Sequence, residues 1–288
     1  KPYYTAAVTV GKLLRYTMVH DFVAGDYMWT GIDYLGEANW PQRSAGCGCL
    51  DTCGFEKDAF YFYKSVWNQK EKFAYLCPHW NLKLEKGTVL PVICYTNCED
   101  AELFVNGRSF GMKSKGFPCY GMTERYGHFD RYRRPANTDD LFLSWDVPYE
   151  PGKIEVVGYH DGKEVCRYKV ETTGGAASIK LTVDKTSVDA DGRSIVQAEV
   201  RIVDSEGRLV FDACPELDFT LEGDAEIIGI DNGDPACHEQ WKETKGRHAF
   251  NGMAYAVIRA GQNKGELKLT VTSSDNTLTN ASVTIQVG

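Results

Sequence analysis

The first 70 residues have apolar side chains at helical spacing. They recur three and four residues apart, with one threonine among them, at Val10, Leu13, Leu14, Thr17 and Met18. This spacing predicts a helix that runs to about His20. The apolar run over residues 22–29 is short and nearly continuous. It is typical of a strand that is covered on both faces, as in a parallel sheet.

A second helix is predicted over residues 57–67, after a long loop at about 31–54. One face of this helix would carry Ala59, Phe60, Tyr63, Val66 and Trp67. A parallel strand needs neighbours on both edges and helices on both faces. We therefore expect the N-terminal segment to be the end of a larger α/β domain.

From about Phe73 the apolar period changes to two, which predicts strands. Asn106-Gly107 and Asp161-Gly162 each separate two apolar runs, and such dipeptides are the strongest short-range signal for a hairpin. Residues 141–145 supply another strand. We predict an all-β sandwich here, with helices confined mostly to the first 70 residues.

Small residues at 172–178 carry no apolar periodicity and predict a linker. Alternating apolar positions then predict about seven strands, the number of an immunoglobulin-like sandwich. They lie at 179–183, 196–202, 217–221, near 228, near 255, at 267–271 and at 283–287. We expect separate cores on the two sides of Gly174-Gly175.

The composition of this chain argues against some classes of binding partner. Among its 288 residues, 43% are hydrophobic and the net charge is -8, so a nucleic acid or an anionic lipid surface is a poor partner. No apolar run is long enough to span a membrane. The chain begins at Lys1 without a signal or transit sequence, so we expect a processed product or a cut segment.

The ten cysteines are few for a chain of this length. Cys47, Cys49 and Cys53 form a C-x-C-x3-C pattern with Cys77 as a fourth thiol, whereas structural zinc usually shows paired C-x2-C units. We expect free thiols with neither a metal nor an essential disulfide framework, and we expect no cofactor.

Candidate chemistry gathers where the strand at 22–29 ends. Trp29 offers a flat apolar face on which a sugar could stack, although a buried core position is an equal alternative. Asp33 and Glu37 could act as an acid and base pair, but their spacing along one loop does not establish the separation of about 5 to 10 Å that glycoside hydrolysis needs.

Two further dyads are His20-Asp21 and Cys237-His238-Glu239. Such groups are more often surface or cap residues than catalytic ones.

The run DFVAGDYMWTGIDYLGE at residues 21–37 strongly resembles the last barrel strand of family 2 glycoside hydrolases of the β-galactosidase type. Residues 50–58 and 61–67 are similar to the following loop and the last helix. The resemblance to the accessory domains of that family lies in residues 78–81, 95–107, 144–149, 230–235 and 249–252. The resemblance covers essentially the whole chain, but it does not account for the cysteines at 47, 49 and 53.

The resemblance implies a mostly β chain in three parts. Residues 1–72 would be the last strand and helix of a (β/α)8 barrel, 73–173 an accessory β-sandwich, and 178–288 an immunoglobulin-like β-sandwich. The family uses two glutamates in a retaining mechanism, after the fourth and seventh barrel strands. Both would precede this chain, so no residue here is expected to be catalytic.

The resemblance also implies a carbohydrate substrate with a terminal β-linked sugar. Trp29 would be the aromatic platform under the sugar ring, and Thr30 and Asp33 would lie in the substrate-facing loop. The chain alone is expected to be inactive. The family's habit suggests a periplasmic or secreted location.

A non-catalytic carbohydrate-binding or surface-adhesion protein is the alternative, and a structural spacer fits only the residues after about 73. The segment at 22–37 favours the enzyme, because a binding module has no use for a lone buried parallel strand. A barrel end without its partners would leave apolar faces bare. We therefore expect self-association, as a homo-oligomer, through residues 1–72.

Overall fold

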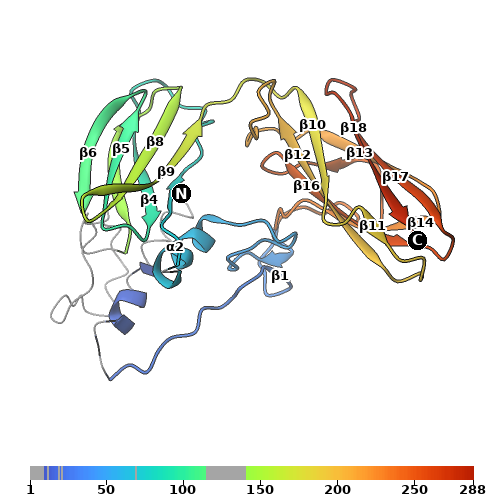
Figure 1. The fold of residues 1–288 in the computed structure, drawn as a ribbon, viewed down its shortest axis with the longest axis horizontal. Helices are drawn as coiled ribbons and strands as arrows, with labels where there is room; N and C mark the ends of the chain where they lie inside the picture. Colours follow the sequence, from blue (N-terminus) through green and yellow to red (C-terminus); the bar gives the residue numbers. More distant parts are fainter. Residues whose placement is uncertain (1–9, 12, 19, 21, 69, 115–140) are drawn as a thin grey trace. The chain divides into compact units, whose positions relative to one another are not determined.

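The computed structural model describes residues 10–11, 13–18, 20, 22–68, 70–114 and 141–288 (Figure 1). The chain divides into two compact units. The first joins Lys1–Gly31 with Glu56–Thr172, and the second joins Ile32–Phe55 with Thr173–Gly288. The loop between the two predicted helices therefore folds with the C-terminal strands.

The described residues of the first unit form two antiparallel sheets with a shared apolar core. One sheet has the order β3-β4-β7, with strands Ala74–Cys77, Val89–Thr96 and Leu143–Pro148. The other has the order β6-β5-β8-β9, with strands Arg108–Ser114, Asp100–Val105, Lys153–His160 and Lys163–Glu171. Alternate residues of β7, namely Leu143, Trp145 and Val147, enter the core. The strands predicted from period two are confirmed.

The two predicted hairpin turns are also confirmed. Asn106 and Gly107 connect β5 to β6 with φ angles of 49° and 81°, and Asp161 and Gly162 connect β8 to β9 with φ angles of 49° and 71°. Two consecutive positive φ angles define the turn whose twist matches that of the flanking strands. Asparagine, aspartate and glycine tolerate this conformation best, so the turns follow from local sequence.

Strand β4 is buried on both of its faces. Val92 and Cys94 belong to the core between the two sheets, whereas Ile93 and Tyr95 belong to a second apolar cluster. This second cluster also contains Leu14, Phe62 and Phe142. A strand that is covered on both sides reads as a continuous apolar run, as residues 92–95 do.

The two predicted helices cover this second cluster. Residues 13–18 are helical, and α2 spans Asp58–Trp67 and packs against β4 (Figure 1). The predicted face of α2 is only partly correct: Tyr63 and Val66 pack against this cluster, but Phe62 and Ser65 are the buried residues of the helix and Trp67 is 60% exposed. Four consecutive aromatic residues at 60–63 make several faces of this helix look apolar.

The strand expected at residues 22–29 is not formed. The described residues from 22 to 30 have no strand, and Phe22 and Tyr27 are 76% and 101% exposed. A strand requires hydrogen-bonded neighbours, and none of the described strands pairs with this segment. Apolar composition alone therefore misled the prediction.

The second unit contains a pair of larger sheets. One has the order β10-β12-β16-β14, with strands Ser178–Val183, Ile195–Val203, Met253–Ala260 and Ala225–Asp231. The other has the order β11-β18-β17-β13-β15, with strands Ser187–Val188, Ala281–Val287, Gly265–Ser273, Glu216–Glu222 and Arg247–His248. The pairing of β11 with β18 is parallel, and the others in these sheets are antiparallel. The seven predicted strands are confirmed, and two short ones are added.

The apolar core of the second unit is separate from that of the first. Val196, Ala198 and Val200 from β12 share this core with Leu267 and Leu269 from β17. The segment Ile32–Phe55 adds the short pair β1 (Tyr34–Leu35) and β2 (Ser44–Ala45). None of the described helices is both long and apolar enough to cross a membrane.

Candidate functional site

Trp29 lies at the surface of the first unit and is 71% exposed. The peptide bond that joins it to Thr30 is cis, and Thr30 is half-buried. Within the described residues, Trp29 is not part of an apolar core. Its indole can therefore present an apolar surface to a ligand.

Asp33 belongs to the second unit and is buried, with 6% of its surface exposed. Its Oδ1 accepts a hydrogen bond of 2.7 Å from the backbone N–H of Gly48, and its own N–H donates to the carbonyl of Leu50. A Cβ on residue 48 would lie 2.4 Å from the Asp33 nitrogen, so only glycine permits this approach. Asp33 therefore orders the loop in which it lies.

Glu37 differs from Asp33 in its surroundings. It is exposed, has a φ angle of 48°, and accepts a hydrogen bond from the Tyr34 hydroxyl. One carboxylate of the considered acid and base pair is thus part of a buried loop, and the other lies at the surface. Trp29 and Thr30 lie in the first unit, and both carboxylates lie in the second.

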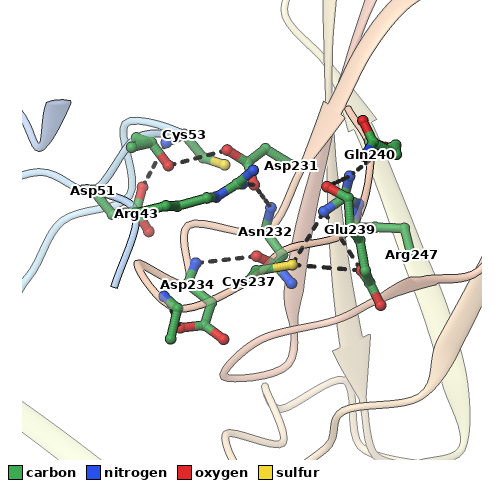
Figure 2. A network of polar contacts seen from close by, with 12 residues as sticks. Arg43, Asp51, Cys53, Asp231, Asn232, Asp234, Cys237, Glu239, Gln240 and Arg247 are labelled. Atoms are coloured by element: carbon green, nitrogen blue, oxygen red, sulfur yellow. Dashed lines mark hydrogen bonds and ion pairs between the residues drawn. The ribbon is translucent and has the colours of Figure 1, made fainter. Parts of the chain in front are cut away.

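Asp231, at the end of β14, holds the segment Ile32–Phe55 in the second unit (Figure 2). Its Oδ1 lies 3.2 Å from Nη2 of Arg43, and its Oδ2 accepts a hydrogen bond of 3.2 Å from the Thr52 hydroxyl. The backbone N–H of Arg43 also donates to the carbonyl of Pro235 at 2.8 Å. The two contacts of the Asp231 carboxylate are charge-assisted and stronger than neutral hydrogen bonds, so they tie Arg43 and Thr52 of this segment to β14.

Asp51 continues this network along the same loop. Its Oδ1 accepts hydrogen bonds of 2.9 Å from the backbone N–H groups of Cys53 and Phe55. Gly233 packs against the carboxylate so closely that a Cβ there would lie 2.0 Å from Oδ2 of Asp51. Burial, followed by the charges of Asp231 and Asp51, raises the pKa of the Cys53 thiol well above its usual range. These surroundings favour the protonated form of the Cys53 thiol.

Aromatic contacts support the other part of the loop. The rings of Trp40 and His238 lie 4.8 Å apart, and Nε2 of His238 lies 2.8 Å from the carbonyl oxygen of Pro41. The guanidinium of Arg43 lies over the ring of Trp241, 5.0 Å from its centre. The connection between β14 and β15 is thus the surface on which the loop rests.

In the Cys237-His238-Glu239 group, Sγ of Cys237 donates a hydrogen bond of 3.6 Å to Oε2 of Glu239, but His238 does not join this pair. His238 contacts Trp40 and Pro41, whereas Cys237 accepts a hydrogen bond of 3.2 Å from Nη1 of the buried Arg247. Burial would raise the pKa of Glu239, but hydrogen bonds from His248 and the charge of Arg247 outweigh it and lower that pKa. These residues hold the connection together (Figure 2).

Of the His20-Asp21 dyad, only His20 lies within the described residues. Its ring lies 4.2 Å from that of Tyr16 and 5.0 Å from that of Phe22. His20 is thus part of a small aromatic group beside the first helix.

Within the described ranges, the one cluster with metal-ligating atoms close together contains Glu99, His160 and Asp161. It consists largely of an ion pair, with Nδ1 of His160 3.0 Å from Oε1 of Glu99. Cys47, Cys49 and Cys53 form no such cluster in that part of the chain, and Cys77 belongs to the other unit.

Sequence reasoning missed the roles of Arg43, Thr52 and Asp231. Asp231 lies 188 residues from Arg43, so no local pattern connects them. Residues 230–235 resemble a family motif, but this resemblance does not indicate which residues elsewhere in the chain contact them.

Comparison with known proteins identifies the origin of this architecture. Residues 179–284 match the model of the glycoside hydrolase family 2 C-terminal domain 5, and residues 87–166 match a domain of unknown function, DUF4982. A Bacteroides ovatus protein named Beta-galactosidase BoGH2A is 37% identical over 90% of this chain. The chain belongs to glycoside hydrolase family 2.

Other relatives of this family 2 chain carry different names. A putative beta-glucuronidase from Formosa agariphila is 32% identical over 86% of the chain. The chain covers 28% of the Bacteroides ovatus protein and 22% of the Formosa agariphila protein, so it spans about a quarter of their length.

A solved beta-glycosidase structure from Bacteroides vulgatus has the same fold over 91% of this chain, with a TM-score of 0.78 and 32% identity. The chain covers 31% of that structure. The mostly β architecture is therefore that of family 2 enzymes.

Proposed function

We propose that this chain is the carboxyl-terminal part of a β-galactosidase-like, retaining glycoside hydrolase that removes terminal β-linked sugars. The observation that carries the proposal is the 37% identity to a protein named Beta-galactosidase over 90% of the chain. In this proposal residues 1–72 complete a (β/α)8 barrel, and the two β-rich regions at 73–173 and 178–288 are accessory domains.

The first contribution of the chain is the exposed indole of Trp29. One face of a sugar ring presents C–H bonds, and stacking that face on an aromatic ring removes apolar surface from water. Thr30 follows directly in the chain, is half-buried, and carries a hydroxyl that could bind a polar group of the sugar. We assign Trp29 and Thr30 to substrate binding on this basis.

The second contribution is an ordered loop. Asp33 lies in a segment that is tied to β14 by Arg43, Thr52 and Asp231. Because both polar and aromatic contacts restrain this segment, a substrate-facing group on it would be preorganised rather than mobile. The C-terminal β-unit would then support the loop that faces the substrate.

The retaining mechanism requires two carboxyl groups about 5 Å apart on either side of the scissile bond. In our proposal both are glutamates of the parent enzyme outside this chain, and neither Asp33 nor Glu37 replaces them. The chain alone is then inactive, although it completes the site in the parent enzyme.

The test compares the isolated chain with the parent enzyme on nitrophenyl β-galactoside and nitrophenyl β-glucuronide. We expect turnover by the parent enzyme, with the galactoside preferred, and none by the chain, whose folding is checked by circular dichroism. Turnover by the chain that requires Asp33 or Glu37 would overturn the assignment of the chemistry. A parent protein that binds sugars but hydrolyses neither substrate would favour a binding function instead.

A further inference from the structure

Two cysteine sulfur atoms lie next to each other in the first unit. Sγ of Cys98 is 3.5 Å from Sγ of Cys166, although 68 residues separate them. Cys98 lies just before β5, in the turn that follows β4, and Cys166 lies on β9. Strand β9 is at one edge of the sheet β6-β5-β8-β9, so the contact joins an edge strand to the start of an inner one.

A glycine makes this approach possible. Gly158 on β8 is paired with Cys166, and a Cβ at residue 158 would lie 2.6 Å from the sulfur of Cys166 and 2.7 Å from that of Cys98. Any side chain at residue 158 would therefore separate the two thiols. The backbone leaves a space that the two sulfur atoms share.

We propose that Cys98 and Cys166 are a redox-active pair that forms a reversible intramolecular disulfide. A disulfide bond is about 2.05 Å long, so the sulfur atoms need to approach by only about 1.5 Å. The bond would fasten edge strand β9 to the turn before β5. This proposal concerns the first unit alone and does not depend on the proposed glycosidase function.

The oxidant in the proposal is a low-molecular-weight disulfide, RSSR. The half-exposed Cys166 is the sulfur that such a molecule reaches. The Cys166 thiol passes its proton to the Cys98 sulfur with which it is hydrogen-bonded, and the Cys166 thiolate so formed attacks one sulfur of RSSR. This step forms a mixed disulfide and releases one thiolate RS⁻, which takes the proton from Cys98. The thiolate of Cys98 then attacks Sγ of Cys166, and the second RS⁻ leaves. In total, two protein thiols lose two electrons and two protons, and RSSR is reduced to two thiols.

The two sulfur atoms share one proton in the reduced pair. The hydrogen bond from the Cys166 thiol, acting against burial and helped by Thr96 and the charges of Lys72 and His160, lowers the pKa of Cys98 to about 6, and the same hydrogen bond raises the pKa of Cys166. Once Cys166 is in the mixed disulfide it donates no hydrogen bond, and the Thr96 hydrogen bond and the charges of Lys72 and His160 still favour the attacking Cys98 thiolate. By contrast, burial raises the pKa of Cys77 well above its usual range.

The test uses the full chain and oxidised glutathione, followed by alkylation in denaturant and a nonreducing tryptic map. We expect peptide 87–108 to be joined to peptide 164–167, with the bond assigned to Cys98 rather than Cys94 by fragmentation. The mass of the chain should fall by about 2 Da from the two lost hydrogens, and dithiothreitol should restore both thiols. The thermal unfolding midpoint should rise on oxidation and return on reduction.

Three variants sharpen the test. Cys98→Ser should stop at a mixed disulfide between glutathione and Cys166, because the resolving thiol is gone. Cys166→Ser changes a half-exposed position and should lose the cross-link. Cys214→Ser removes an exposed cysteine and should leave the cross-link unchanged.

Two outcomes in the wild-type chain would overturn the proposal without any variant. One is a stable glutathione adduct on Cys166. The other is full alkylation of both Cys98 and Cys166 after a treatment with oxidised glutathione that has already converted Cys214 to its glutathione adduct.

Discussion

Nη2 of Arg43 lies 3.2 Å from Oδ1 of Asp231, across 188 residues of sequence. This ion pair joins the loop that carries Asp33 to the end of β14. The β-unit that follows Thr173 thereby acts on a segment that precedes the whole first sandwich. An accessory β-unit in this chain has a direct structural role in ordering a candidate substrate loop.

Arg43→Ala should loosen this loop. The side chains of the pair are about one-fifth exposed, so loss of this ion pair should lower the free energy of opening the loop by about 1 kcal/mol. Hydrogen exchange of the amides in residues 43–55 should become roughly fivefold faster. Arg259→Ala is the matched control, because it breaks an exposed ion pair with Glu226 elsewhere in the same unit. Equal protection of the loop in both variants would contradict the role of Arg43.

Gly233→Ala should disturb the same loop from the opposite side. Gly233 and Gly207 have φ angles of 76° and 79°, but only at residue 233 would the new methyl group meet an atom, namely Oδ2 of Asp51. Gly207→Ala is therefore the control. Both variants should lose stability because of the backbone conformation, and Gly233→Ala should lose about 1 to 3 kcal/mol more of unfolding free energy because of the steric clash. Urea unfolding of the two variants measures the difference.

Trp29→Ala in the parent enzyme should slow catalysis without unfolding the protein. If the whole apolar face stacks on the sugar, its loss costs about 2 to 4 kcal/mol of transition-state binding, or roughly 30- to 1000-fold in kcat/KM. Steady-state kinetics and the thermal midpoint check the two parts of this statement. A Trp29→Ala enzyme that unfolds would show instead that this residue supports the structure of the parent.

Asp204→Asn should destabilise the second unit in a pH-dependent manner. Burial would raise the pKa of Asp204, but the Arg208 side chain and the N–H groups of Arg208, Gly174 and Glu206 hold it far below its usual range. The variant should lose about 2 to 3 kcal/mol near neutral pH.

The pH dependence of this effect has a definite sign. A pKa that is lower in the folded state stabilises above the unfolded value of about 3.9, and this stabilisation is lost as the pH falls towards the folded value. The gap in unfolding free energy between wild type and Asp204→Asn should therefore be constant from pH 7 to about 5 and narrow below about 4. Asp189→Asn, at an exposed position, serves as the control.

The local parts of the fold could be predicted from the sequence. Asn106-Gly107 and Asp161-Gly162 specify their turns through the φ angles that these residues tolerate, and alternating side chains specify strands such as β12. The strand expected at 22–29 could not be judged in this way, since its apolar side chains give no information about its hydrogen-bonding neighbours. The sugar platform that the sequence suggested at Trp29 stays a prediction.

The candidate site was predictable only in part. The sequence indicated Trp29, Thr30 and Asp33 but not the internal role of the Asp33 carboxylate, which depends on the close approach of Gly48. Arg43 and Asp231 could not be paired because charge and spacing do not define contacts over such a separation. The same applies to Cys98 and Cys166, whose proximity depends on the pairing of β8 with both β5 and β9.

The double burial of β4 limits where this chain can be divided. Ile93 and Tyr95 on β4 share an apolar cluster with Phe62 of α2, on the face of the sheet that is turned away from the sandwich core. A fragment that began at residue 73 would expose this face to water and invite aggregation. The practical unit for expression or for transfer to another enzyme therefore starts before Asp58, and the second helix travels with the sandwich that follows it.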